Sequence, residues 1–457
     1  MRSLPSLSLV ALSACATISK ERGHAEVAQL VEQRTGRRTS WDQGPPEADQ
    51  IAKRLDELLK GGLTRDRAVE IALVNNPTLQ VTYEELGVSQ ADMVQAGLLS
   101  NPSLSGSVGF PAGGGRLEYE SSIVQSFLDI FVLPLRKRVA AQQFTADTLR
   151  VAHEALQVAA DVSKQFAIVQ ANMKTAELER MVVQAAHAAA DLADRQHRAG
   201  NITDLALAIE QATYQQTRLA LAREELALAR SREELDRLLG LWGPRTDWTV
   251  AEDLPELPGV ELRLDHLESA AIRQRLDVDA ARKQAILMSN AVDLARTTRY
   301  FGVVEVGVHI HQDPDGPRLF GPTLSLQLPV FDQRQAVIAR LEGQQRQAER
   351  RLAALSINAR SEVRVARLRL SASRETVAHY RTVLLPLREK VVEQSQLQYN
   401  GMQLGLFELL AAKQAQVEAY RSYIEAVRDY WIVRAELERV MGGRVGSPIT
   451  FATGGTP

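Results

Sequence analysis

The chain contains one cysteine, Cys15, among its 457 residues, so it can form no internal disulfide. Aromatic residues make up only 5% of the sequence, while Ala, Leu, Arg, Glu and Gln dominate long stretches. This balance favours extended helices over a compact enzyme core. The formal net charge is only -2, so no strong overall field attracts the chain to nucleic acid.

The sequence also lacks long apolar segments and the common catalytic motifs. No apolar run of the length that a transmembrane helix needs follows Cys15, so any crossing of a membrane would have to be made by strands. There is no nucleotide-binding glycine loop, nucleophile elbow or zinc-protease helix. We therefore expect neither enzymatic activity nor a cofactor.

The N-terminus has the layout of an export signal. Arg2 supplies a positive charge, residues 4 to 12 are mainly apolar, and the segment runs into Leu12-Ser13-Ala14-Cys15. This tetrapeptide resembles the bacterial lipobox, after which the cysteine becomes the acylated first residue, for example with palmitate. We expect a signal peptide at 1 to 14 and a lipidated extension at 15 to 62. An ordinary signal peptide with a chance cysteine is the alternative.

The rest of the chain is an internal duplication. Residues 71 to 110 align with 271 to 310 without a gap, and Ala199-Gly200 then falls on Asn400-Gly401. The matched order of helix, strands and glycine breaks predicts two repeats joined by a linker and followed by a short tail. These segments are expected at 63 to 240, 266 to 442, 241 to 265 and 443 to 457, respectively.

Each repeat is predicted to contain one β-hairpin, at 103 to 126 and at 303 to 328. Apolar and polar residues alternate with period two, and glycine-rich or Asp-Pro-Asp-Gly turns separate the strands. The strand lengths fit a tilted membrane crossing, with the apolar face toward lipid and the polar face toward water. A sheet packed on a soluble core would show the same alternation. The charged and imidazole side chains expected on the water-filled side are Glu118, Glu120, Glu305, His309 and His311.

Four strands cannot close a barrel, because the smallest membrane barrels have about eight. Open strand edges are not tolerated in hydrocarbon. Several chains must therefore pool their hairpins; two chains would give eight strands and three would give twelve.

Very long helices should follow each hairpin. A helical pattern without glycine or proline covers 135 to 198, roughly 95 Å, and returns over 203 to 239. The second repeat shows the same order at 333 to 399 and 404 to 441, although Pro386 should interrupt its long helix. Shorter helices before the hairpins, at 76 to 99 and 277 to 298, would supply the missing length.

Together these features resemble the TolC family of outer-membrane efflux channels. The resemblance covers residues 63 to 442 and rests on motifs whose order and spacing match the family. They are Leu63-Thr64-x-x-x-Ala68-x-x-x-Ala72-x-x-x-Asn76-Pro77-x-Leu79, Asn101-Pro102-x-Leu104, Leu328-Pro329-Val330-Phe331 and the turns at Gly200 and Gly401. The resemblance implies a mainly α-helical chain with membrane β structure. In the family, a homotrimer builds a twelve-stranded outer-membrane barrel and a helical barrel in the periplasm.

The family also implies a passive duct for drugs or metal ions. Its partners would be a resistance-nodulation-division pump in the inner membrane and a periplasmic adaptor. Two helical turns would receive the adaptor, with the candidate contact residues Gly200, Asn201, Thr203, Asp204, Gly401, Met402 and Gly405. A duct of type I protein secretion and a periplasmic structural coiled-coil lipoprotein are the alternatives.

One cluster contains residues of metal-ligand type. His309, His311 and Asp313 would share one face of a strand, which a transition metal could use. We favour a polar, water-facing surface over a resident metal site, because such a surface requires no metal.

Overall fold

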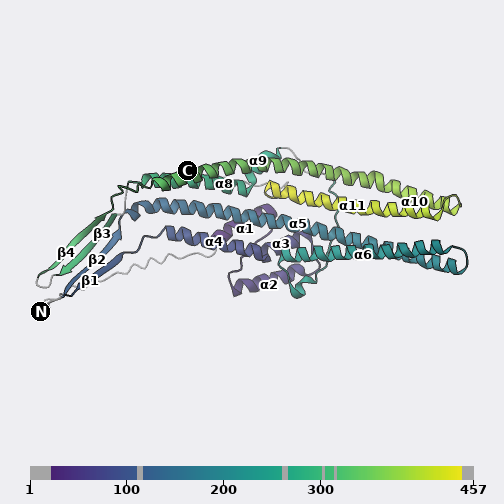
Figure 1. Cartoon of the computed structure of the whole chain (residues 1–457), viewed down its shortest axis with the longest axis horizontal. Helices are drawn as coiled ribbons and strands as arrows, with labels where there is room; N and C mark the ends of the chain where they lie inside the picture. The colour runs from purple at the N-terminus through teal and green to yellow at the C-terminus, as the bar shows by residue number, and fades with distance from the viewer. Residues whose placement is uncertain (1–21, 111–116, 260–265, 301–303, 313–315, 445–457) are drawn as a thin grey trace. The chain divides into compact units, whose positions relative to one another are not determined.

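The computed structural model describes residues 22–110, 117–259, 266–300, 304–312 and 316–444. In these ranges the chain is mainly helical with one four-stranded antiparallel sheet, which confirms the predicted fold class (Figure 1). None of the helices in the described ranges combines the length and apolarity that a membrane span requires.

The first half of the chain begins with helices that the sequence did not predict, α1 (Arg22–Thr35) and α2 (Pro45–Leu59). The predicted order then follows as α3 (Arg65–Asn75), α4 (Pro77–Ala96), β1 (Ser103–Gly109), β2 (Glu118–Ser126), α5 (Leu128–Arg198) and α6 (Asp204–Leu239). A short 3-10 helix, η1 (Gly243–Thr246), lies in the linker.

The second half repeats this order. Its elements are α7 (Leu267–Gln274), α8 (Leu276–Thr297), β3 (Val304–Gln312), β4 (Arg318–Leu326), α9 (Gln335–His379), the π-helix η2 (Tyr380–Leu384), α10 (Leu385–Asn400) and α11 (Leu406–Met441). The predicted interruption near Pro386 is therefore present, as a π-helical turn directly before α10. Proline has no N–H to donate, so a change of the hydrogen-bond pattern there has a local cause.

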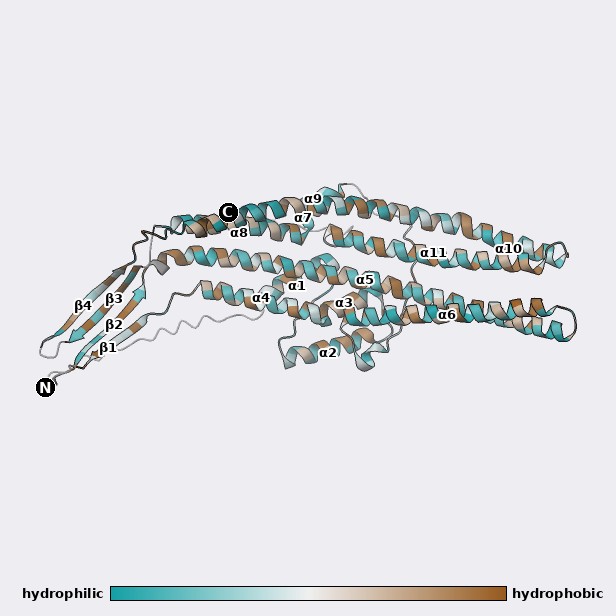
Figure 2. Ribbon diagram, in the orientation of Figure 1, coloured by the Kyte–Doolittle hydropathy of each residue, from teal (hydrophilic) through white to brown (hydrophobic). Residues whose placement is uncertain are grey.

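The two hairpins form one sheet with the order β1-β2-β3-β4. Ile123 lies opposite both Leu104 and Val308, and Val308 lies opposite Pro322. Because side chains alternate along a strand, this register collects the apolar residues on one face. Figure 2 shows the polar and apolar residues interleaved along the strands.

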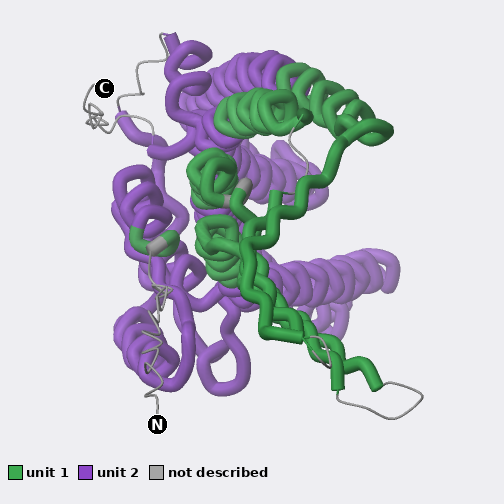
Figure 3. Tube along the Cα trace, turned by 90° about the vertical axis from the view of Figure 1, so that its left-hand side faces the viewer, with its two compact units in different colours: residues 1–25, 84–148, 281–350 green, residues 26–83, 149–280, 351–457 purple. Residues whose placement is uncertain are grey.

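The chain divides into two compact units (Figure 3). The first comprises residues 1–25, 84–148 and 281–350, and so contains the sheet and the helix segments next to it in sequence. Within it, Asn290 of α8 donates to Gln142 of α5 at 2.8 Å, and Ser89 of α4 donates to Asp147 at 2.7 Å.

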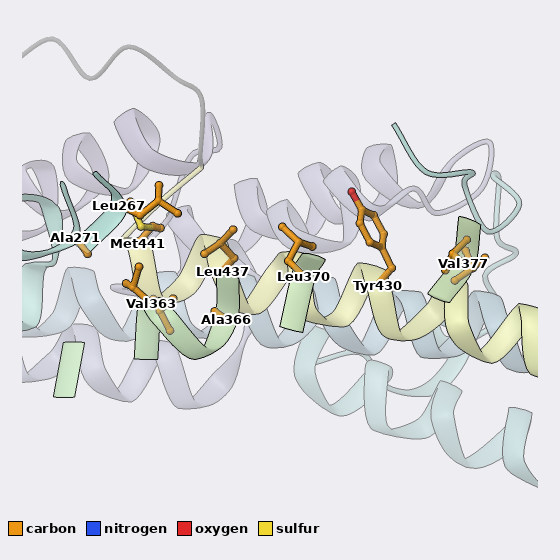
Figure 4. Close-up of a cluster of buried hydrophobic side chains, with 11 residues drawn as sticks. Leu267, Ala271, Val363, Ala366, Leu370, Val377, Tyr430, Leu437 and Met441 are labelled. Atoms are coloured by element: carbon orange, nitrogen blue, oxygen red, sulfur yellow. The ribbon is translucent and has the colours of Figure 1, made fainter. Parts of the chain in front are cut away.

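The second unit comprises residues 26–83, 149–280 and 351–457. One of its hydrophobic clusters joins α7, α9 and α11, with Leu370, Tyr430 and Leu437 fully buried (Figure 4). These side chains recur along α9 and α11 at helical spacing, so each helix buries a stripe against the other.

The duplication is visible where each returning helix ends. Gly240 and Gly442 end α6 and α11 in the left-handed conformation, with φ of 68° and 80°. A Cβ on Gly240 would lie 2.5 Å from the Asn75 carbonyl oxygen, at the junction of α3 and α4. A Cβ on Gly442 would lie 3.1 Å from the Cα of Arg275, at the junction of α7 and α8. Each glycine therefore allows the close approach of two helix ends.

The gap-free alignment predicted from the sequence was wrong in detail. The C-caps Asn76 and Arg275 are equivalent, so the offset at this junction is 199 residues. It is 202 at the ends of α5 and α10. The π-helix η2 accounts for one of the three residues gained between these two points, because a π turn holds one more residue than an α turn.

Candidate functional site

The register of the sheet brings the predicted water-facing side chains onto one face. Glu120 lies opposite His311, and Ser122 lies opposite His309. Glu118 is two residues before Glu120, so it points to the same side. Glu305 is on this face too, at the other end of β3, where it pairs with Ser126 and Ser325.

Polar contacts connect the side chains of this face. The His311 Nε2 and Glu118 Oε1 atoms are 4.0 Å apart, and His309 Nδ1 is hydrogen-bonded to the Thr323 hydroxyl at 3.1 Å. The Ser105 and Ser122 hydroxyls are 2.8 Å apart. Polar contacts therefore link all four strands on this face, although Val124 and Leu319 also lie on it.

Asp313, the third member of the predicted metal cluster, lies outside the described residues. Within the described ranges, no group of three His, Cys, Asp or Glu side chains is arranged to hold a metal ion. Cys15 and the predicted signal peptide also lie outside these ranges.

The first candidate contact turn joins α5 to α6 and is held by polar contacts. Gly200 has a φ of 76°, and the Asn201 N–H donates to the carbonyl of Gln196 at 2.9 Å. Thr203 caps α6 by accepting from the Ala206 N–H at 3.2 Å. The Asp204 carboxylate lies 2.6 Å from His197 Nε2. This turn is therefore fixed at both helix ends.

The second turn, from α10 to α11, follows the same path with different side chains. The Gln403 N–H donates to the carbonyl of Gln398 at 2.8 Å, but the left-handed position is Met402, with a φ of 56°. Gly405 is the N-cap of α11 and offers no side-chain hydrogen bond. The structural equivalent of Gly200 is therefore Met402, and that of Thr203 is Gly405. The predicted match of Gly200 with Gly401 was therefore wrong by one residue. The two repeats align by the ends of their helices, and this alignment does not place the two glycines at the same position.

Sequence reasoning missed the buried ion pairs of the second unit. Arg275, whose side chain is 4% exposed, contacts Asp277 at 2.7 Å and Glu362 of α9 at 2.5 Å. Arg421 of α11 pairs with Glu179 of α5 and lies 3.8 Å from Glu224 of α6. This arginine therefore ties helices of both repeats together.

A partly buried cluster of three charged residues also joins the repeats, at Glu436 of α11. Its carboxylate lies 2.5 Å from Lys164 of α5 and 2.5 Å from Arg439. Burial alone would raise the pKa of Glu436, but the hydrogen bonds from Arg439 and Lys164 outweigh it and lower the pKa to about 2. The carboxylate is thus charged at neutral pH and holds two cations in place.

No family model matches the chain. It is 22% identical over 391 residues to the cobalt-zinc-cadmium resistance protein CzcC of Cupriavidus metallidurans. The aligned region covers 84% of this chain and 90% of that protein.

Solved structures of outer-membrane channels have the same fold. The structure of CusC, described as undergoing transmembrane channel formation, matches with a TM-score of 0.69 and 17% identity, over 86% of this chain and 92% of that one. The CmeC outer-membrane channel of Campylobacter jejuni matches with a TM-score of 0.71 and 14% identity, over 89% of each. The predicted resemblance is confirmed at this level: the chain has the fold of the TolC-family outer-membrane channels.

Proposed function

We propose that this chain is the outer-membrane channel of a tripartite efflux system. Three copies would pool their sheets into a twelve-stranded barrel, with the apolar face toward lipid and the polar face toward water. The duct is passive and has no turnover of its own, because an inner-membrane pump supplies the energy.

The observation that carries this proposal is the sheet with two unpaired edges. Among the described strands, β1 and β4 each pair on one side only. In hydrocarbon, each unpaired backbone group would cost several kcal/mol. Pairing β4 of one copy with β1 of the next removes these edges, and the channel fold of the solved structures supports such closure.

The helices also carry apolar residues that a single chain leaves exposed. Leu219 and Leu226 of α6 are 61% and 60% exposed, and Leu368 of α9 is 70% exposed. Leu219 and Leu226 are seven residues apart and therefore lie on the same side of α6. We assign them to the neighbouring copies of the trimer.

Metal cations are the cargo that we favour over drugs. Support comes from the resemblance to CzcC, which is named for cobalt, zinc and cadmium resistance. The three glutamates of the polar sheet face would also bias the pore toward cations.

The proposal extends to the partners and the anchor. The two turns between the long helices would receive a periplasmic adaptor, which links the duct to a resistance-nodulation-division pump. Cys15 would be acylated after removal of the signal peptide and hold the chain in the outer membrane.

The test combines a biochemical and a cellular measurement. The full-length protein, purified in detergent, should form heat-stable trimers and conduct ions in planar bilayers. Deleting the gene should increase sensitivity to cobalt, zinc or cadmium, and the wild-type gene should restore tolerance. A water-soluble monomer without conductance would overturn the proposal. Unchanged metal tolerance with loss of a secreted protein would instead identify a protein-secretion duct.

A further inference from the structure

The polar sheet face carries imidazole and carboxylate groups side by side on its two central strands. Glu118 and Glu120 belong to β2, and His309 and His311 belong to β3 (Figure 1). Glu120 is directly opposite His311, with Glu118 one step along the same face. A water-filled duct needs polar residues here, but it does not need histidine beside glutamate.

The geometry of the closest pair is near that of a shared metal ion. His311 Nε2 and Glu118 Oε1 are 4.0 Å apart. Two ligand atoms on one tetrahedral zinc ion lie about 3.4 Å apart, given metal-ligand bonds of about 2.0–2.1 Å. The side chains are 26% and 51% exposed, so both are accessible to an ion from solvent.

The residue types set the class of cation. Imidazole favours zinc, cobalt and related transition metals, whereas magnesium and calcium prefer oxygen ligands alone. A site with only two protein ligands, in which water fills the other coordination positions, binds a metal ion weakly and releases it quickly. Weak binding is what conduction requires, since an ion must leave as readily as it enters.

We propose that His311 and Glu118, with Glu120 beside them, form a weak exchanging site for divalent transition-metal cations on their way through the duct. The inference rests on the proposed function, because it requires this face to line a conducting pore. It adds a place in the duct where cargo is recognised by its coordination chemistry in addition to its charge.

The experiment measures block of single-channel current by metal ions. The purified full-length channel is placed in planar bilayers with potassium chloride, and Zn²⁺, Cd²⁺ or Mg²⁺ is added. Zn²⁺ and Cd²⁺ should reduce or interrupt the current at concentrations at least ten-fold below those needed for Mg²⁺. The variants H311A and E118Q should each raise the half-blocking concentration of Cd²⁺ about ten-fold. H311C should retain block by Cd²⁺, because a thiolate is a soft ligand.

E305Q is the matched control, since it removes the same charge from the same face at the other end of β3. It should leave the half-blocking concentration within about two-fold of wild type. If E305Q raises the half-blocking concentration of Cd²⁺ as much as E118Q does, the block depends on the overall charge of the pore and the inference is overturned. Block by Mg²⁺ at the same concentrations as Zn²⁺ and Cd²⁺ would overturn it in the same way. Normal conductance without metal block would overturn the site alone, whereas no conductance would overturn the proposed function and the site with it.

Discussion

At the scale of single residues, Gly307 has the least space of the strand glycines. It lies between β2 and β4, where an added Cβ would be 2.3 Å from the Ile123 carbonyl oxygen and 2.5 Å from Val124 Cγ1. Real Cβ contacts are never this short, so G307A should push β2 and β3 apart. We expect a several-fold lower yield of trimer on detergent gels of samples that have not been boiled.

Gly106 provides the control for this substitution. An added Cβ there would lie 3.5 Å from the Glu120 carbonyl oxygen, an ordinary contact distance. G106A should therefore assemble like wild type, although it also replaces a strand glycine. Equal trimer yields from G307A and G106A would show that the β2 and β3 strands can separate locally at no cost.

Glu436 should make stability depend on pH. Its pKa is lowered to about 2 in the folded protein, so its contribution is fully present above the unfolded value of 4.5 and is lost as pH falls toward 2. E436Q removes this contribution, which is at most about 3 kcal/mol, since one pKa unit corresponds to about 1.4 kcal/mol. Thermal unfolding of the solubilised protein should show a lower Tm for E436Q at pH 7, with the gap to wild type narrowing below about pH 4.5.

Glu418 offers a comparison on the same helix. Its side chain is 69% exposed and lies 3.9 Å from Arg421, so its ion pair is screened by water. E418Q should leave Tm unchanged over the whole range. If the difference in Tm between E436Q and wild type stays constant with pH, the effect of the substitution comes from packing and not from charge.

At the scale of elements, the sequence predicted what short-range patterns control. Period-two alternation located both hairpins, and glycine breaks located the ends of α5 and α6. The N-terminal helices α1 and α2 were missed, although the apolar residues Ile51, Leu55 and Leu58 recur on α2 at helical spacing. The π turn η2 was also missed, since Pro386 signals an interruption but not the hydrogen-bond pattern that absorbs it.

The two helical turns should differ in stability because their caps differ. Thr203 caps α6, and T203A should cost about 1 kcal/mol locally. Gly405 has extended backbone dihedrals but no cap, and G405S would create Ser-x-x-Glu with Glu408, a capping box. A Cβ there would meet only the end of the exposed Glu408 side chain, which can move aside.

Hydrogen exchange of backbone amides would measure both effects. G405S should slow exchange in the first turn of α11 several-fold, and T203A should speed exchange in the first turn of α6. The other turn in each variant serves as the internal control. Unchanged exchange in G405S would mean that the carboxylate of Glu408 already protects these amides.

At the scale of the whole molecule, the duplication predicts the repeated elements but not the contacts that join the repeats. Arg421 and Glu179 are 242 residues apart in sequence, and Arg275 and Glu362 are 87 apart. No local pattern connects such residues, because each looks like a solvated charge on a helix. These pairs depend on how the helices pack: Arg275 precedes α8 and reaches Glu362 of α9, and Arg421 of α11 reaches Glu179 of α5.

The orientation of the sheet gives the sharpest test of the whole assembly. Leu324 and Ser325 are neighbours on β4, opposite Val306 and Glu305, and so they point to opposite faces. If the apolar face meets lipid, L324K places a charge in hydrocarbon at a cost of up to about 2–4 kcal/mol, depending on depth. S325K places the same charge in water beside Glu305.

We therefore expect L324K to reduce the amount of trimer in the outer membrane, whereas S325K assembles normally and shifts ion selectivity toward anions. If the sheet instead packed on a soluble core, neither lysine would change membrane association and no current would be measured for either variant.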